Sequence, residues 1–258
     1  MGTIIEIENL RKEFVLSYFP KRSILACNDI NIKINRGEIV GIVGESGSGK
    51  STLAMCMSKL IPINSGKIIF ENKDISSLNN REMRPLRKNI QLIFQDPYSS
   101  LNPRMKVRDL IAEGIRIHKN LESKNNITDL VLNVLEKVGL ASNDLDKFPK
   151  DFSGGQRQRI AIARALAVEP NFIICDEPVS ALDMSIQAQI INLLIKLKKE
   201  NNLSILFISH DLSVINFLCD RVYVMQNGSI IESDTCNEIF KNPKEIYTKE
   251  LLASSYLN

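Results

Sequence analysis

The sequence predicts an α/β fold in which a helical subdomain is inserted into a strand-rich core. Several short apolar runs end in polar residues, as buried strands do, and these lie at residues 39–43, 172–175 and 203–208. Residues 105–145 instead follow a helical period, with no strand signal between them. Residues 3–8 alternate isoleucine with polar residues, which is typical of an antiparallel strand with one buried face.

These segments predict a single domain over residues 1–258 with two unequal parts. We expect the core and an antiparallel β subdomain to comprise about residues 1–95 and 169–258. The helical subdomain then comprises about residues 96–168.

The composition limits the classes of function. The chain has 258 residues, 33 basic and 30 acidic, and this near balance gives no electrostatic reason to expect a nucleic acid partner. No apolar run approaches the ~18 residues that span a bilayer, and the first residues do not have the pattern of a signal peptide. The five cysteines are scattered without a C-x-x-C pair, so we expect small apolar residues in a reducing compartment such as the cytosol.

The strands near the N-terminus predict a hairpin beside the core. Residues 29–35 alternate in the same way as residues 3–8, and a turn at Arg36-Gly37 leads into residues 38–43. This pattern is typical of an antiparallel hairpin, which we expect to pack beside the strand at residues 39–43. Three aromatic residues lie upstream in a polar stretch, namely Phe14, Tyr18 and Phe19. An aromatic ring there could stack on a base or could simply pack, and Phe14 is the preferred candidate for stacking.

A glycine-rich stretch follows the apolar run at residues 39–43 and precedes a helix-capable segment at residues 53–60. Its residues are Gly44, Glu45, Ser46, Gly47, Ser48, Gly49, Lys50, Ser51 and Thr52. Strand, glycine-rich turn, Lys-Ser and helix is the order of a phosphate-binding loop, in which backbone N–H groups converge on an anion. Lys50 would then reach the β- and γ-phosphates, and the Ser51 hydroxyl would hold Mg²⁺.

Polar residues also follow three other apolar runs. Gln95 follows residues 89–94, and it could bind Mg²⁺, orient water or cap a turn. Asp176 ends the run at 172–175, where it could hold Mg²⁺ through water while Glu177 orients the attacking water. His210 follows residues 203–208, where a structural role is common, but its company with Asp176 and Gln95 favours a catalytic one. The second histidine, His118, is expected at the surface after a helix.

A second candidate anion site opens the helix expected at residues 157–168. Ser153 and Gln156 have the spacing of a capping box, and Gly154 and Gly155 between them would leave bare N–H groups facing outward. Two phosphate-like sites in one chain suggest that each is half of a composite site completed by a second subunit.

The C-terminal third continues the α/β pattern. We expect a helix at 185–199 and a hairpin of strands 221–225 and 229–231 around Asn227-Gly228. A short helix capped by Thr235 and a final helix at 244–252 complete the chain.

Together these motifs resemble those of the ATP-binding subunits of ABC transporters, over essentially the whole chain. The phosphate loop is similar to their Walker A motif, residues 173–177 to Walker B with its catalytic glutamate, and residues 180–183 (S-A-L-D) to the D-loop. Gln95 matches the Q-loop and His210 the switch histidine. The most specific match is S-G-G-Q at 153–156, the family signature, which here is preceded by Phe152 where leucine is usual.

Longer stretches resemble the peptide and nickel importer branch. They are F-Q-D-P-Y-S-S-L-N-P-R at 94–104, D-E-P-V-S-A-L-D-M-S-I-Q-A-Q at 176–189 and N-P-K-E-I-Y-T-K-E-L-L at 242–252. In the last of these, Glu245-Ile246 replaces the usual His-Pro of the branch.

The resemblance implies a P-loop NTPase (RecA-like) core that binds ATP and Mg²⁺, with Ser51, Gln95 and Asp176 at the metal. It also implies that the 153–156 motif of a second ATP-binding subunit closes over the γ-phosphate and that Asp183 connects the two sites. The chain would then bind membrane permease subunits at the cytoplasmic face of the membrane and, through them, act with an extracytoplasmic binding protein. It would power uptake of peptides, nickel or a related solute.

Three alternatives remain open from the sequence. A soluble ABC-type ATPase of DNA repair or translation commonly has two cassettes or long inserts, whereas this sequence has a single compact cassette, and co-purification with a permease would separate the two. A P-loop GTPase or kinase would not explain residues 153–156, and a GTPase would also need N-K-x-D, whereas Asn72-Lys73-Asp74 places the aspartate one position early. An ATP-gated interaction module would bind nucleotide without hydrolysing it.

Overall fold

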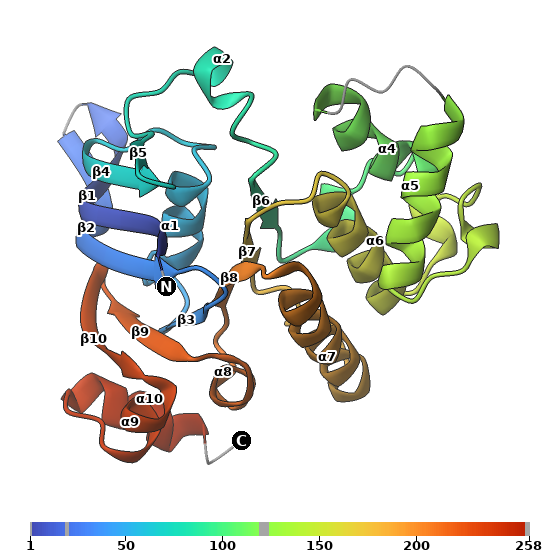
Figure 1. Ribbon diagram of the computed structural model, residues 1–258. Coiled ribbons are helices and arrows are strands. Elements are labelled where there is room, and N and C mark those ends of the chain that lie inside the picture. The colour runs from blue at the N-terminus through green and yellow to red at the C-terminus, as the bar shows by residue number, and fades with distance from the viewer. Residues whose placement is uncertain (1, 19–20, 119–123, 256–258) are drawn as a thin grey trace.

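The computed structural model describes residues 2–18, 21–118 and 124–255, and Figure 1 shows a strand-rich part beside a helical part. The central sheet has the strand order β10 (Ser229–Thr235), β9 (Arg221–Gln226), β3 (Ile39–Val43), β8 (Ser204–Ile208), β7 (Phe172–Asp176) and β6 (Ile90–Ile93). Neighbouring strands from β9 to β6 are parallel, and β10 pairs antiparallel with β9. Every residue of β3, β7 and β8 is buried, which explains why these strands read as continuous apolar runs.

The second sheet is antiparallel, with the order β2 (Lys21–Asn35), β1 (Thr3–Tyr18), β4 (Ser65–Phe70) and β5 (Lys73–Asp74). Residues 29–35 of β2 pair antiparallel with β1 (Thr3 with Asn35, Ile7 with Ile32). The fully buried β3 instead takes a place inside the central sheet, where only an apolar strand fits.

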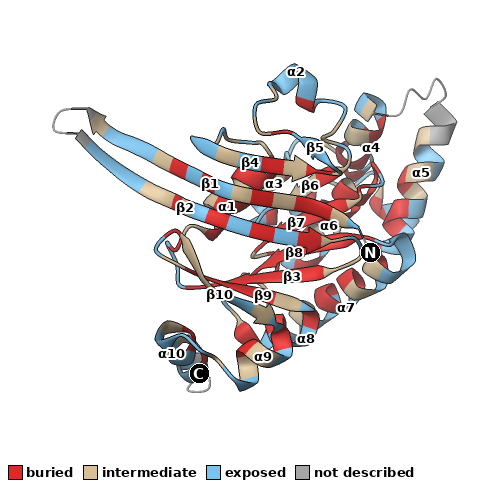
Figure 2. Ribbon diagram, turned by 60° about the vertical axis from the view of Figure 1, so that its left-hand side comes forward, coloured by how far each residue is buried: buried red, intermediate tan, exposed pale blue. Residues whose placement is uncertain are grey.

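The strands β1 and β2 are also longer than expected. They form a ribbon whose far end projects from the molecule, and Figure 2 shows that end to be largely exposed. Phe14 therefore lies within strand β1 and not in a connection between strands. Phe19, one of the three aromatic candidates, lies outside the described residues.

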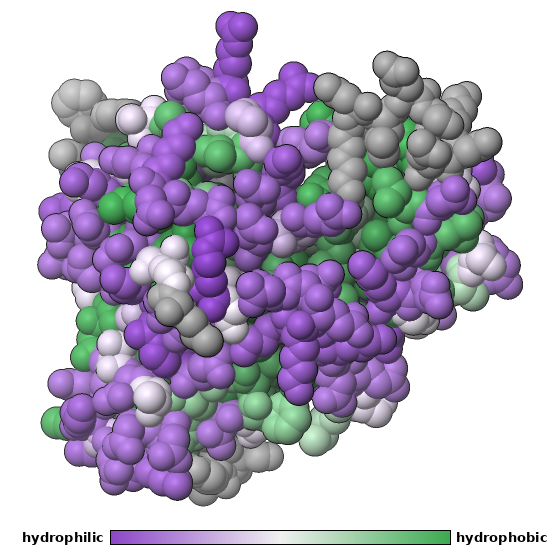
Figure 3. Space-filling model, viewed as in Figure 1, coloured by the Kyte–Doolittle hydropathy of each residue, from purple (hydrophilic) through white to green (hydrophobic). Residues whose placement is uncertain are grey.

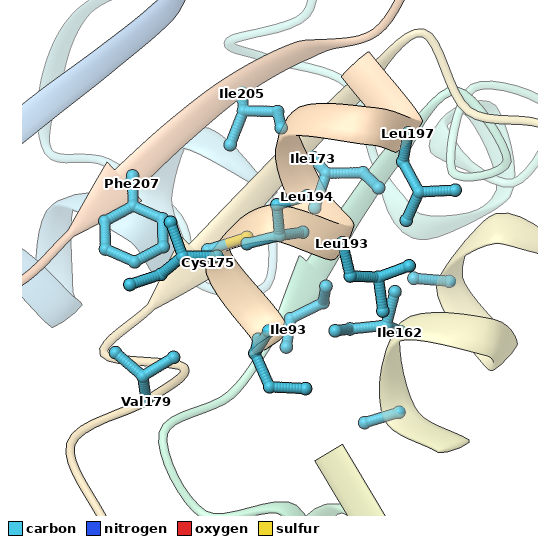
Figure 4. Packing of buried hydrophobic residues seen from close by; sticks show 14 of the residues in the cluster. Ile93, Ile162, Ile173, Cys175, Val179, Leu193, Leu194, Leu197, Ile205 and Phe207 are labelled. Atoms are coloured by element: carbon cyan, nitrogen blue, oxygen red, sulfur yellow. The ribbon is translucent and has the colours of Figure 1, made fainter. Parts of the chain in front are cut away.

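Two apolar clusters hold the central sheet between its neighbours. On one face, side chains of β1, β2 and β4 pack with α1 (Lys50–Met57) against alternate residues of the sheet such as Ile42 and Leu206. On the other face, α7 (Met184–Asn201) and α8 (Leu212–Leu218) cover the remaining residues. Figure 4 shows Ile173, Ile205 and Phe207 of the sheet meeting Leu194 of α7. Burial of these side chains stabilises the fold by about 1.5–3 kcal/mol each.

The helical part contains α3 (Pro97–Ser100), α4 (Val107–His118), α5 (Lys124–Lys137) and α6 (Gly154–Leu166), with 3-10 turns η1 (Ser142–Asp144) and η2 (Pro149–Asp151) between α5 and α6. The short helix α2 (Asn80–Met83) precedes β6 and was not expected. Helix α6 begins three residues before the expected Arg157, because the capping box already fixes the first turn. His118 was expected beyond a helix but is the last residue of α4.

The chain ends with α9 (Cys236–Lys241) and α10 (Ile246–Ser255), which follow the β9–β10 hairpin (Figure 1). That hairpin has the Asn227-Gly228 turn that the sequence predicts, with Gln226 paired to Ser229. Polar side chains cover most of the face shown in Figure 3. Among the described residues, the structure contains no helix with both the length and the apolarity that a membrane crossing requires.

Candidate nucleotide site

The glycine-rich loop connects β3 to α1 at the carboxyl end of the parallel strands. Gly44, Gly47 and Gly49 all have positive φ, at 151°, 83° and 108°. A Cβ atom on Gly44 or Gly49 would lie 2.1 Å from the carbonyl oxygen of Met225 or Ala26, so these two positions have no room for a side chain. A Cβ on Gly47 would meet nothing within 4 Å, because this glycine faces open space. The loop therefore packs closely on Met225 and Ala26 at Gly44 and Gly49, and at Gly47 it is open to a ligand.

Lys50 lies across this loop and is almost fully buried, with 5% of its surface exposed. Its Nζ donates hydrogen bonds to the carbonyl oxygens of Gly44 and Glu45, both at 2.8 Å. Burial lowers the pKa of Lys50, while the carboxylates of Glu177 and Asp176 oppose that shift. The ammonium group is thus a concentrated positive charge, and a phosphate could displace the two carbonyl oxygens as its hydrogen-bond partner.

The loop borders a cavity of about 910 Å³, a size suited to a nucleotide. The expected site residues that line it are Phe14, Ser46, Gly47, Gly49, Lys50, Ser51, Thr52, Gln95, Glu177 and His210. The parallel strands bring these residues together, since β3, β6, β7 and β8 end on the same side of the sheet.

Sequence reasoning did not assign part of this cavity wall. Ile24, Leu25 and Ala26 of β2 line it, as does the Asn227-Gly228 turn. The turn contacts the phosphate loop, because the Gly228 N–H donates to the carbonyl oxygen of Ser48 at 2.9 Å. The Asn-Gly pair predicted a hairpin, but nothing in its local pattern indicated that the hairpin reaches the loop.

Glu177 contacts two other residues that line the cavity, Gln95 and His210. Its Oε2 atom accepts a hydrogen bond from Gln95 Nε2 at 3.0 Å, and His210 Nδ1 lies 3.1 Å from the same oxygen. The Ser180 hydroxyl donates to the Glu177 carbonyl oxygen at 3.1 Å. The backbone of Glu177 has φ 48°, a left-handed conformation that costs a non-glycine residue about 1–2 kcal/mol. Such strain persists where the surrounding structure imposes it, as it does at many functional sites.

Asp176 does not line the cavity itself but contacts Ser51, which does. The Ser51 hydroxyl donates to Asp176 Oδ1 at 3.1 Å. Burial raises the pKa of Asp176, and neighbouring Glu177 raises it further, while the Ser51 hydrogen bond and Lys50 act in the opposite direction. A hydroxyl and a carboxylate in contact are oxygen donors of the kind that Mg²⁺ prefers, so these residues fit that ion.

Phe14 borders the cavity from the β1–β2 ribbon, opposite Ile24 in the pairing of the two strands. Phe14 as a residue is 37% exposed, and Lys12 Nζ lies 4.9 Å from the centroid of its ring. An exposed ring at the cavity edge can stack on a base. The assignment of Phe14 to that task stays a prediction.

The segment 153–156 does not line this cavity. It forms the capping box that the sequence predicts: the Gln156 N–H donates to Ser153 Oγ at 3.3 Å, and the Ser153 N–H donates to Gln156 Oε1 at 3.0 Å. Gly154 is exposed and Gly155 is buried. A Cβ on Gly155 would lie 2.4 Å from Ile186 Cγ2, so this glycine permits the close approach of α6 and α7.

Asp183 does not line the cavity either, and its side chain caps the N-terminus of α7. Its Oδ1 accepts hydrogen bonds from the Ile186 N–H at 2.9 Å and the Ser185 hydroxyl at 2.7 Å. These bonds, that of Ile186 foremost, hold the pKa of Asp183 below its usual range. Asp183 therefore has a structural task within the chain, and any task between subunits is additional.

Comparison with known proteins identifies the family to which these features belong. The family model described as "ABC transporter" matches residues 27–180. The oligopeptide transport ATP-binding protein OppF of Streptococcus mutans is 47% identical over 251 residues, which cover 97% of this chain and 81% of that protein. The dipeptide transport ATP-binding protein DppF of Lactococcus lactis is 45% identical and covers 97% of this chain and 80% of its own length.

Solved structures agree with the sequence relatives. A dimeric, post-hydrolysis ATP-binding cassette, MJ0796 bound to ADP and Pi, superimposes with a TM-score of 0.81 at 29% identity, covering 90% of this chain and 98% of that one. The cbiO1 subunit of Clostridium perfringens, part of the ABC transporter complex cbiONQ, gives 0.81 at 31% identity and covers 100% and 96%. These matches confirm the α/β P-loop NTPase fold expected from the sequence. The chain belongs to the ABC transporter family, as one of its ATP-binding subunits.

Proposed function

We propose that this chain hydrolyses ATP, with Mg²⁺, to power the uptake of peptides through an ABC importer. One observation carries the enzymatic part of the proposal: Glu177 and the phosphate loop border the same cavity. A carboxylate there lies on the same side as the terminal phosphate of a nucleotide held by the loop. It is therefore suited to accept a proton from an attacking water molecule.

Binding of the phosphates falls to the loop and Lys50. The loop offers backbone N–H groups and the N-terminal end of α1, and Lys50 adds a full charge. In exchanging its two carbonyl partners for phosphate oxygens, the ammonium group gains stronger, charge-assisted hydrogen bonds.

Gln95 and His210 orient the general base. Both contact Glu177 Oε2, so they hold the carboxylate in one rotamer while the cavity is open to water. A bound Mg²⁺ ion, held by Ser51 and Asp176 with Gln95 nearby, would supply charge that stabilises the phosphate oxygens.

The active unit is a dimer in this proposal. The position of residues 153–156 supports this, because they do not reach the cavity of their own chain and are available to a second cassette. The exposed Gly154 N–H region would then close over the γ-phosphate of the partner subunit, and Asp183 would lie between the two sites. The second subunit is an identical chain or a related one.

Coupling to the membrane follows from the place of Gln95. This residue contacts Glu177 on one side and leads directly into α3 and the segment up to Arg104 on the other. We propose that residues of about 96–168 move as a subdomain on closure and that the surface from Gln95 to Arg104 passes this movement to a permease. The chain would thus act at the cytoplasmic face of the membrane, bound to the permease as a peripheral subunit.

The peptide cargo is proposed from the relatives, whose names specify oligopeptide or dipeptide transport. The decisive experiment reconstitutes the chain with the permease that co-purifies with it and measures phosphate release. Addition of the peptide-loaded binding protein should raise the rate, whereas the same complex with Glu177→Gln should stay inactive. If neither the permease nor the peptide-loaded binding protein changed the rate of phosphate release, a soluble ABC-type ATPase would be favoured instead.

A further inference from the structure

The C-terminal helix contacts the phosphate loop through one side chain. Tyr247 lies in the first turn of α10, and its hydroxyl oxygen accepts a hydrogen bond from the Glu45 N–H at 3.0 Å. The two residues are 202 positions apart in the sequence. The Tyr247 side chain is half-buried, since one side packs against the apolar core.

The peptide groups of Glu45 are thereby held at both ends. The N–H is bound to Tyr247, and the carbonyl oxygen receives Lys50 Nζ at 2.8 Å and the Ser48 N–H at 3.2 Å. Glu45 itself does not line the cavity. Its carbonyl oxygen is one of the two that Lys50 would exchange for phosphate oxygens when a nucleotide binds.

Helix α10 is in turn anchored by a carboxylate from β10. Glu232 is buried, with 9% of its surface exposed, and it accepts the Lys244 N–H at 2.8 Å and the Glu245 N–H at 3.1 Å. Burial favours the neutral acid, yet the hydrogen bonds donated to the carboxylate outweigh it and lower the pKa of Glu232. Both amides immediately precede α10, so Glu232 holds the start of this helix, and with it the position of Tyr247 in the first turn.

We propose that Tyr247 is a positioning residue for the phosphate loop: its hydroxyl holds the Glu45 segment in the form that receives nucleotide phosphates, and Glu232 supports it. The inference deepens the proposed function, since it assumes only that the loop binds ATP and requires neither permease nor peptide. The hydroxyl matters for binding because a loop already in shape loses less conformational entropy when the nucleotide arrives.

The test compares two tyrosine-to-phenylalanine variants of the full chain. Tyr247→Phe removes the hydroxyl oxygen that accepts the hydrogen bond from the Glu45 N–H. Tyr223→Phe is the matched control, because the Tyr223 hydroxyl likewise accepts a backbone N–H, that of Lys33 at 3.1 Å, but in another part of the fold. Titration with ATP should give a Kd about 3- to 10-fold higher for Tyr247→Phe, the effect of one hydrogen bond, and an unchanged Kd for Tyr223→Phe. At saturating ATP, kcat should stay within about twofold, because the hydroxyl touches no reacting atom.

A double-mutant cycle separates positioning from general stability. Glu232→Gln alone should raise the Kd for ATP in the same direction, and it should have no further effect in the Tyr247→Phe background. Equal loss of affinity in both tyrosine variants, an unchanged Kd in Tyr247→Phe, or additive effects of Glu232→Gln would each overturn the inference. A wild-type chain that binds ATP but is not stimulated by peptide would defeat only the proposed transport function.

Discussion

His210 Nδ1 lies 3.1 Å from Glu177 Oε2, and the Gln95 amide donates to that same oxygen at 3.0 Å. Residues from the ends of three parallel strands thus converge on one carboxylate atom. The convergence explains how a backbone strained at Glu177 can still hold its side chain in a single orientation.

Removal of the Glu177 charge should stop hydrolysis and preserve binding. We expect Glu177→Gln to lower the rate of phosphate release by about 10²–10⁴-fold, the usual contribution of a general base. ATP binding should persist, because the loop and Lys50 are unchanged, and a titration with a fluorescent nucleotide measures it. Near-normal turnover would remove Glu177 from this role.

Loss of His210 should slow the reaction without weakening the nucleotide complex. A hydrogen bond to a charged group contributes about 1.5–3 kcal/mol, so His210→Ala should reduce kcat by about 10- to 100-fold. His118→Ala is the matched control, since it replaces the second of the two histidines at a position that does not line the cavity. If both variants lost activity equally, the contact with Glu177 would not explain the effect.

Replacement of Lys50 should act on binding itself. Lys50→Ala removes the charge that lies beside the loop, and we expect the Kd for ATP to rise by about 10- to 100-fold. Lys73→Ala, an exposed lysine on the edge strand β5, serves as the control for a change of net charge. Unchanged affinity in Lys50→Ala would show that the backbone groups alone bind the phosphates.

The ionised carboxylate of Asp176 should lower the free energy of unfolding of the nucleotide-free protein. Burial raises its pKa above the unfolded value, so the folded state is penalised while the carboxyl is ionised, and the penalty fades as the pH falls through that raised pKa toward the unfolded value. Asp176→Asn should therefore raise the Tm at neutral pH by about 2–4 °C, which corresponds to about 1 kcal/mol. Because asparagine does not titrate, the Tm advantage of the variant over the wild type should shrink as the pH falls through that range, and the stimulation of ATPase activity by Mg²⁺ should be lost. A lower Tm in the variant would contradict this account.

Gly155 should tolerate no side chain beside α7. Gly155→Ala places a methyl group 2.4 Å from Ile186 Cγ2, and such overpacking costs about 1–3 kcal/mol in the free energy of unfolding. The change Ile186→Ala in the same chain should recover part of this loss, because it removes the opposing atom. Denaturant unfolding of both variants measures the effect, and Gly154→Ala, with its nearest neighbour at 3.4 Å, is the control.

Much of the site was predictable because its signals are local. The glycine-rich loop needs a defined order of residue types, and polar residues that follow buried parallel strands must meet at one edge of the sheet. The capping box at 153–156 was equally readable, since it depends on two side chains three positions apart.

The rest depends on contacts between distant segments. Alternation in residues 29–35 indicates one buried face but does not specify the partner strand, which is β1. The contacts of Tyr247 with Glu45 and of Gly228 with Ser48 arise only after the strands are in place. The sequence around Gly155 indicates an anion site at a helix start, but it does not indicate that Ile186 of α7 packs against this glycine and buries it.

Finally, the burial of all five cysteines has a practical use. Burial also raises the thiol pKa of Cys175 and brings that of Cys236 to about 11, so little reactive thiolate is present on either at neutral pH. Maleimide dyes should therefore label the native chain poorly, and one new cysteine at exposed Ser23 of the ribbon would carry the fluorophore. Energy transfer between labelled chains could then follow two cassettes as they close, in a background that needs no prior cysteine removal.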